Sequence, residues 1–292
     1  MVAIPAAVLA KLSKPIVFNV ILYSLTISLI SIWIVDASTA AGQDTLVGIV
    51  GKDFVLLGAD SSCSLRGTIA LTASNVDKIY VISDPGAQTG VQQQRPQKHW
   101  SSVAAAAAGN PADYHRLLGL LRAHAAIREY ENGVGCDVEC VFEGGSTTAT
   151  ATATATSAYL PLGLDARALA HLARVEISSS LRSSAPLQMC LLLAGMTYDD
   201  NESMRPSLQP CLYWLDNTGF MQRVSYGAHG YGSNFLWSIL DRDYKPNMSK
   251  EEACSLLKGC FEQLRTRYVK NTGPNPPFIK CLDAINGCTT VQ

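Results

Sequence analysis

The order of the apolar segments constrains the fold of this chain more than any other feature of its sequence. Short apolar runs with strand character come first, and two amphipathic helical segments follow. A second set of strand-like runs, two more helical segments and a closing strand complete the order. Elements that are segregated in this way favour antiparallel sheets covered by helices, because a parallel sheet would need strands and helices to alternate. The sequence therefore predicts an α+β fold.

The expected elements follow from apolar runs for strands and from apolar stripes at helical spacing for helices. The expected strands cover residues 44–50, 53–60, 79–83, 102–108, 187–195, 211–216, 221–226 and 276–283. The expected helices start at residue 110, cover 165–181 and 233–242, and start again at residue 249. Asn110 is a good N-cap, and Pro111 tolerates the first helical position. Ser249 and Glu252 have the spacing of a capping box.

The N-terminal region differs from the rest of the chain. Ile16–Val35 contains 20 residues without a charge, enough for a helix to span a bilayer, and small residues follow it. This pattern is typical of a membrane-targeting segment. We interpret residues 1–43 as an apolar leader or a mispredicted extension, and residues 44–292 as one globular domain. Insertions are expected at about 84–100, rich in Gln, Gly and Pro, and at about 133–160, with a Thr/Ala repeat.

Composition excludes several classes of protein. A hydrophobic content of 48% with 16% charged residues excludes a mostly disordered chain. Lys and Arg number 23 and Asp and Glu 24, so a general affinity for nucleic acid has no support. The nine scattered cysteines are unlike a disulfide scaffold and are expected as reduced thiols. The histidines have no metal-binding spacing, so no metal or cofactor is expected, and His229 is expected in a loop with a structural hydrogen bond.

Four stretches carry a resemblance to a known family. They are LVGIVGKDFVLLGAD at 46–60, AHGYG at 228–232, SILDRDYKP at 238–246 and MSKEEA at 248–253. Together they resemble proteasome beta subunits, most of all the non-catalytic beta type-2 subunit of the 20S core. The resemblance covers about residues 44–287. It implies an N-terminal nucleophile hydrolase-like fold, a four-layer αββα sandwich of two antiparallel sheets between helix layers.

The resemblance also implies partners and a location. The chain would assemble with other proteasome alpha and beta subunits in a hetero-oligomeric core of 28 subunits, in cytoplasm and nucleus, without a cofactor or nucleic acid. Membrane association is not expected despite Ile16–Val35. The assembled core would support ATP- and ubiquitin-dependent protein degradation.

Active members of the family use an N-terminal Thr, which is freed by self-cleavage after a Gly and activated by its own α-amine. A nearby Asp and Lys polarise that site, and these roles match Asp60 and Lys78. Counting back from Asp60 places Asp44 at the nucleophile position, after Gln43 instead of a Gly. Thr45 lies one residue after the nucleophile position, and in a strand this shift would turn its hydroxyl to the opposite face.

Three further family residues are also replaced. Tyr231 and Pro274 stand where the family has two serines, and Asn271 stands where it has a second Asp. Only Asp60 and Lys78 remain, and they are expected to form a buried ion pair. The leading hypothesis is a non-catalytic structural subunit with no catalytic residue. Two alternatives stay open: an active threonine peptidase that uses Thr45, and a membrane-anchored or exported globular protein of unrelated role.

Overall fold

The computed structural model describes six stretches of the chain. These are residues 44–64, 71–84, 102–131, 164–198, 208–267 and 275–291. The apolar run Ile16–Val35 and nearly all of the two expected insertions lie outside them, so the division of the chain at residue 43 stays a prediction. No helix in the described stretches is long and apolar enough to cross a membrane.

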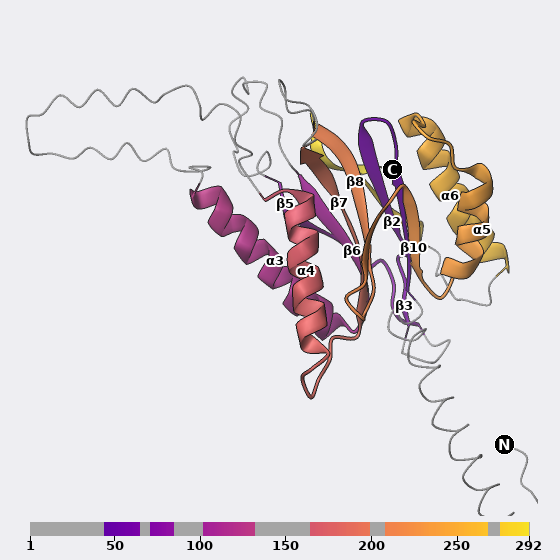
Figure 1. Cartoon of the computed structure of the whole chain (residues 1–292). Coiled ribbons are helices and arrows are strands. Elements are labelled where there is room, and N and C mark those ends of the chain that lie inside the picture. Colours follow the sequence, from indigo (N-terminus) through magenta and orange to yellow (C-terminus); the bar gives the residue numbers. More distant parts are fainter. Residues whose placement is uncertain are drawn as a thin grey trace, which may run out of the picture. The chain divides into compact units, whose positions relative to one another are not determined.

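Two five-stranded antiparallel sheets form the centre of the domain (Figure 1). The first sheet has the order β10 (Tyr226–Gly230), β1 (Thr45–Val50), β2 (Phe54–Ala59), β11 (Phe278–Asp283) and β12 (Gly287–Val291). The second has the order β5 (Ile79–Ser83), β6 (Val103–Gly109), β7 (Met189–Tyr198), β8 (Leu208–Leu215) and β9 (Met221–Val224). The short strands β3 (Cys63–Ser64) and β4 (Leu71–Ala73) pair separately.

Helices cover the outer face of each sheet (Figure 1). Helices α3 (Pro111–Glu131) and α4 (Ala166–Ser180) pack on the second sheet, and α5 (Ser233–Asp243) and α6 (Lys250–Arg267) pack on the first. The predicted αββα sandwich of two antiparallel sheets between helix layers is therefore confirmed.

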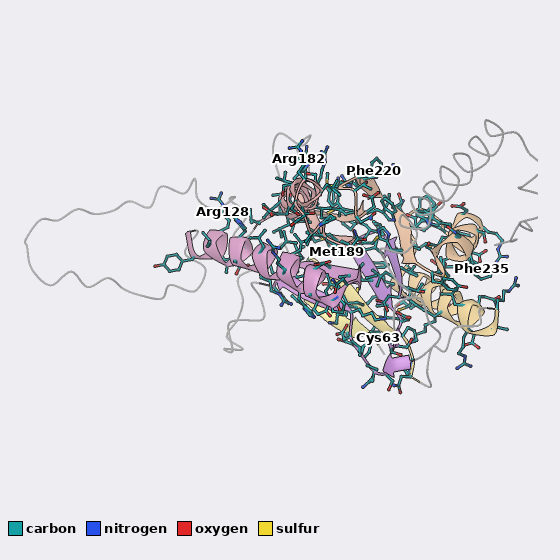
Figure 2. All side chains as sticks on the ribbon, turned by 90° about the horizontal axis from the view of Figure 1, so that it is seen from below. Cys63, Arg128, Arg182, Met189, Phe220 and Phe235 are labelled. Atoms are coloured by element: carbon teal, nitrogen blue, oxygen red, sulfur yellow. The ribbon has the colours of Figure 1, made fainter. Side chains whose placement is uncertain are left out.

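Apolar side chains fill the three spaces between these four layers. Strand β1 illustrates how the alternation works: Val47 and Ile49 pack toward α5 and α6, whereas Leu46 packs between the sheets. The sheets approach closely, because a Cβ atom on Gly48 would lie 2.7 Å from the side chain of Leu212. In Figure 2, charged side chains such as Arg128 point outward from the helix layer.

The predicted helix starts are confirmed by their capping contacts. The amide of Ala112 donates to Asn110 Oδ1 at 3.3 Å. The amide of Ser249 donates to Glu252 Oε2 at 3.0 Å, and the amide of Glu252 donates to Ser249 Oγ at 3.3 Å. The capping box thus satisfies two amides that have no partner within the helix.

Two predictions about strands were wrong. Residues 221–226 do not form one strand, because β9 ends at Val224 and the chain crosses at Ser225 to the other sheet, where β10 begins. The crossing is fixed by the amide of Val50, which donates to the carbonyl of Ser225 at 2.8 Å. The strand β11 also does not close the fold, because β12 pairs with it after a turn that ends at Gly287 with φ +70°.

Candidate functional site

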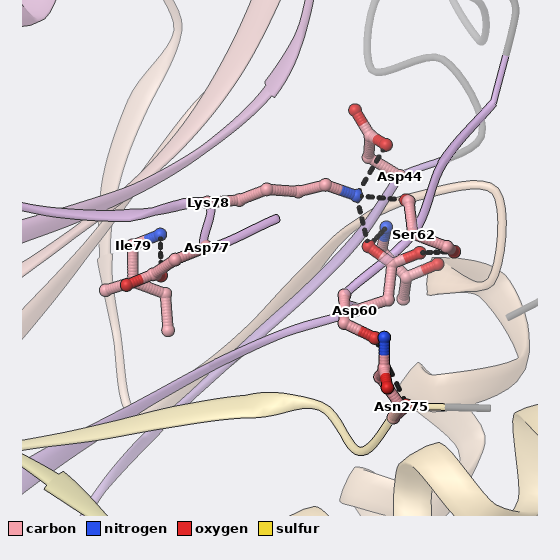
Figure 3. Close-up of polar contacts among 9 residues, drawn as sticks. Asp44, Asp60, Ser62, Asp77, Lys78, Ile79 and Asn275 are labelled. Carbon is pink, nitrogen blue, oxygen red and sulfur yellow. Dashed lines mark hydrogen bonds and ion pairs between the residues drawn. The ribbon is translucent and has the colours of Figure 1, made fainter. Parts of the chain in front are cut away.

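Three charged residues lie at the ends of strands that meet at one end of the sandwich (Figure 3). Asp44 directly precedes β1, Asp60 directly follows β2, and Lys78 directly precedes β5. Strands β1 and β2 are antiparallel neighbours, so the start of one adjoins the end of the other. The topology therefore brings together residues that are up to 34 positions apart in the sequence.

Lys78 is the centre of this cluster. Its Nζ lies 2.7 Å from Asp44 Oδ1 and 2.7 Å from Asp60 Oδ1, and it also donates to the carbonyl of Ser62 at 2.6 Å (Figure 3). The side chains of Lys78 and Asp60 are 1% and 4% exposed, whereas that of Asp44 is 14% exposed. The expected ion pair between Asp60 and Lys78 is thus present and buried, and Asp44 joins it.

The charge state of Lys78 follows from two opposing effects. Burial alone lowers the pKa of an ammonium group, but the carboxylates of Asp60 and Asp44 outweigh burial and raise the pKa of Lys78 above 10.5. Lys78 is consequently an ammonium ion at neutral pH. In that form it stabilises the two carboxylates and cannot accept a proton.

Asp60 also fixes the first strand. Its Oδ1 accepts the amide of Thr45 at 3.1 Å, and its own amide donates to the carbonyl of Thr45 at 3.1 Å. Ser62 Oγ lies at hydrogen-bonding distance, 3.5 Å, from Asp60 Oδ2. One carboxylate therefore holds the start of β1 and the lysine at the same time.

A second charged pair supports Lys78, and the sequence analysis missed it. Lys280 Nζ lies 2.6 Å from Asp77 Oδ2 and donates to the carbonyl of Ile79 at 2.6 Å. The amide of Ile79 in turn donates to Asp77 Oδ1 at 2.9 Å. Both chain neighbours of Lys78 are therefore fixed. Asp77 could have been noticed in the sequence, because it is a charged residue just before an apolar strand. Nothing in the sequence indicates that Lys280 is its partner.

Thr45 lies on a different side of β1 from Asp44. It alternates with Val47 and Ile49, which pack toward α5 and α6, and it is 2% exposed. The three acceptors that surround the Lys78 ammonium come instead from Asp44, Asp60 and Ser62.

The backbone of Asp44 is held by an unusually close strand. Gly230 of β10 pairs with Thr45 and has φ +95°, and a Cβ atom at Gly230 would lie 1.6 Å from the carbonyl oxygen of Asp44. Only glycine permits this approach. Tyr231 follows Gly230 directly and its side chain is 57% exposed, at a position where the family resemblance implies a serine. Gln43, Asn271 and Pro274 lie outside the described residues.

His229 is not the loop residue that the sequence suggested. It belongs to β10, is 5% exposed, and stacks on Trp214 with ring centroids 4.4 Å apart. Burial lowers its pKa to about 4, and its Nε2 has no hydrogen-bond partner among the residues that the structure describes. Within the described stretches no three His, Cys, Asp or Glu side chains are grouped to hold a metal ion, and the seven described cysteines are free thiols.

Comparisons with known proteins give a consistent picture. The family model described as proteasome subunit matches residues 161–274. A probable proteasome subunit beta type-4 of Neurospora crassa is 29% identical over 77% of this chain and 84% of the relative. Proteasome subunit beta type-2-A of Arabidopsis thaliana is 28% identical over 82% of this chain and 90% of the relative.

A third relative matches a shorter part more strongly. A probable proteasome subunit beta type-4 of Schizosaccharomyces pombe is 40% identical over 36% of this chain and 51% of the relative. The two long matches each cover more than three quarters of the chain, and the αββα sandwich agrees with them. The chain is similar to proteasome beta subunits over most of its length.

Proposed function

We propose that this chain is a non-catalytic, structural subunit of the beta ring of the 20S proteasome core. The observation that carries the proposal is the contact of 2.7 Å between the Asp44 carboxylate and the Lys78 ammonium. Asp44 is the position that the family resemblance assigns to the nucleophile. A carboxylate that is bound to a lysine in this way serves as a structural anchor.

The chemistry of peptide hydrolysis supports the proposal that this subunit is non-catalytic. A threonine peptidase needs a hydroxyl next to a free amine that acts as its base. Asp44 offers an anionic carboxylate, and its charge would oppose the oxyanion that develops on the substrate carbonyl, where active sites supply donors. Lys78 is surrounded by three acceptors, so its positive charge is already compensated.

The alternative that uses Thr45 has less support from the geometry. Its side chain is buried on the α5–α6 side of β1, and its backbone amide is bonded to Asp60. A nucleophile in that place would be separated by the strand from the space beside Lys78. The hypothesis of an active peptidase would be established only if a covalent probe labelled Thr45 in assembled particles.

The proposed role is assembly with other proteasome alpha and beta subunits in a core of 28 subunits, in cytoplasm and nucleus. The named relatives are beta subunits, which supports this role. Several large apolar side chains are exposed on the chain alone and would suit burial against neighbours. They are Ile127, Tyr130, Val175, Leu181, Phe220, Tyr231 and Ile285.

The test of catalytic status is labelling of assembled particles with an epoxyketone or vinyl-sulfone probe, followed by mass mapping of every modified subunit. We expect adducts on the catalytic subunits of the same particles, which are the internal control, and none on this chain. A Thr45→Ala variant should leave every peptidase activity of the particles unchanged. An adduct on Thr45 would establish the active-hydrolase alternative.

The test of assembly is native fractionation of the source cells with peptide mapping of this subunit. We expect the chain in core particles, without peptides from Ile16–Val35. Asn201 and Asn247 each begin an Asn-x-Ser sequence. A glycan at either site, or a membrane fraction that holds the chain apart from core particles, would favour the exported or anchored alternative.

A further inference from the structure

The strands at the edges of the two sheets differ in how their outer backbone groups are satisfied. These strands are β5, β9, β10 and β12. An edge strand has N–H and C=O groups that no neighbouring strand accepts, and proteins usually cap, cover or interrupt such an edge. Within the described stretches β5, β9 and β10 show a device of this kind, whereas β12 shows none.

The edge of β5 is capped by side chains. The carbonyl of Lys78 bonds to β6, so by alternation Ile79 and Val81 face outward. The carbonyl of Ile79 accepts Lys280 Nζ at 2.6 Å, and the carbonyl of Val81 accepts Arg122 Nε at 2.9 Å. Cationic side chains therefore occupy the positions at which another strand would pair.

The edges of β10 and β9 are protected in other ways. By the same alternation the carbonyl of Ala228 in β10 faces away from β1, and it accepts Trp214 Nε1 at 3.1 Å. Strand β9 has only four residues, and the exposed Arg223 is one of them. Short edge strands and charged side chains both disfavour pairing with a further strand.

The pairing registers determine which groups of β12 face outward. The amide of Asp60 bonds to the first strand, so by alternation the odd-numbered residues of β2, Leu57 among them, bond to β11. Lys280 is the partner of Leu57 and faces β2. The next residue, Cys281, therefore faces β12 and bonds to its partner Thr289.

Cys288 and Thr290 consequently direct their amide and carbonyl groups away from β11. In the part of the chain that the structure describes, no side chain bonds to these groups. Thr290 is exposed, Cys288 is half-buried, and β12 contains neither a charged residue nor a proline. Each of the two residues offers one donor and one acceptor, so the edge can bind an extended backbone.

We propose that an extended segment of a neighbouring subunit pairs with β12 and continues the first sheet across the boundary between the two subunits. The proposal rests on the proposed function, because it takes the neighbour to be another subunit of the core. Recognition is through the backbone, as in β-strand addition. The segment must therefore be extended and free of proline where it meets Cys288 and Thr290.

The small number of bonds indicates what kind of partner can use this edge. Each hydrogen bond contributes little net free energy, so two to four of them give an affinity no better than about millimolar. A free peptide, or a second free copy of this chain, would not stay bound. A neighbour that other contacts already hold in place presents its segment at a high effective concentration, and the same few bonds then suffice.

Hydrogen exchange tests the proposal residue by residue. It is measured by mass spectrometry with electron-transfer fragmentation on the isolated full chain and on assembled particles. In the isolated chain the amides of Cys288 and Thr290 should exchange rapidly and those of Thr289 and Val291 slowly, because only the latter two bond to β11. In particles the amide of Thr290 should exchange at least about 100-fold more slowly. A Thr290 amide that is fast in particles, or already slow in the isolated chain, would overturn the proposal.

Variants of Thr290 separate pairing from folding. Thr290→Pro removes the outward amide, and Thr290→Val keeps that amide and is the matched control. Urea unfolding of the isolated chains should find both variants folded, whereas Thr289→Pro should be destabilised because its amide bonds to β11. When each variant is expressed together with the native chain, Thr290→Pro should enter particles about tenfold less than Thr290→Val. Equal entry of these two variants, or a folded Thr289→Pro beside an unfolded Thr290→Pro, would contradict the proposed edge.

Photocrosslinking identifies the occupant. Benzoylphenylalanine replaces Thr290, and the particles are irradiated and mapped. We expect an adduct on one segment of a different subunit. An adduct only on a second copy of this chain, or only within the chain itself, would refute a neighbouring subunit as the occupant. Absence of the native chain from particles would overturn the proposed function together with this proposal, whereas a fast Thr290 amide in particles that contain the chain would overturn this proposal alone.

Discussion

Replacing Lys78 with methionine keeps a side chain of similar length but removes the ammonium that joins three strand ends. The carboxylates of Asp44 and Asp60 and the carbonyl of Ser62 then lose a donor at 2.6–2.7 Å. Asp60 is 4% exposed, so water does not readily replace the lost partner. Breaking a buried pair from one side costs about 3–5 kcal/mol, a large share of the 5–15 kcal/mol that stabilises a typical domain.

Urea-induced unfolding of the purified chain measures this loss. Trp214 is a suitable fluorescent reporter, because it packs between the sheets against His229. With a denaturant dependence of about 3 kcal/mol per molar urea, the midpoint should fall by about 1–1.7 M. Lys52→Met is the matched control, because Lys52 is exposed, and we expect a change within about 0.5 kcal/mol.

The pH dependence gives a second check on the same variant. The folded pKa of Lys78 is raised above 10.5, so its contribution is fully present below pH 10.5 and is lost as the pH rises through the folded value. The difference in stability between the native chain and Lys78→Met should therefore stay constant from pH 7 to pH 10 and shrink above pH 10.5. A cost below about 1 kcal/mol, or a difference that changes between pH 7 and pH 10, would refute the assignment of Lys78 as a charged anchor.

Four further substitutions have expected outcomes that urea unfolding also measures. His229 has a folded pKa of about 4, so stability should fall by up to about 3 kcal/mol from pH 6.5 to pH 4, and His229→Phe should flatten that slope. Gly230→Ala should cost more than about 3 kcal/mol, because its Cβ would overlap the carbonyl of Asp44, whereas Gly259→Ala on open α6 should stabilise by about 0.5–1 kcal/mol. Ser249→Ala should cost about 1 kcal/mol through its lost helix cap; a neutral result would show that the cap contributes nothing.

Asp60 could be selected from the local sequence, whereas Asp44 and Lys78 were selected through the family resemblance, although each of the three adjoins an apolar run. Asp60 ends one apolar run, and Lys78 precedes another. The sequence predicted only the pair of Asp60 and Lys78, and the contact of Lys78 with Asp44 was found in the structure, where the β1–β2 hairpin places Asp44 near Asp60. Lys280 could not be selected in this way, because its partner Asp77 is more than 200 residues away and its own strand gives no sign of a polar role.

Antiparallel sheets covered by helices were predictable from the order of the elements, and the four layers from the family resemblance, but the assignment of each strand to a sheet was not. The sequence pattern of β9 and β10 does not distinguish them, although they belong to different sheets. The difference lies in distant pairing, such as that of Gly227 with Gly48 and His229 with Leu46. His229 therefore looked like a loop residue among glycines, although those glycines allow β10 to approach β1 closely.

The strand order of the first sheet has a consequence for synthesis on the ribosome. The β1–β2 hairpin is made first, yet its two neighbours, β10 and β11, are made at residues 226–230 and 278–283. At about 5–20 residues per second, the finished hairpin waits roughly 8–35 seconds for the first neighbour. During that time both of its edges and the apolar face that packs against α5 and α6 lack their native cover, and pairing over such sequence distances is slow. Nascent chains that stop before Tyr226 should therefore bind chaperones, and those that extend past Val291 should release them.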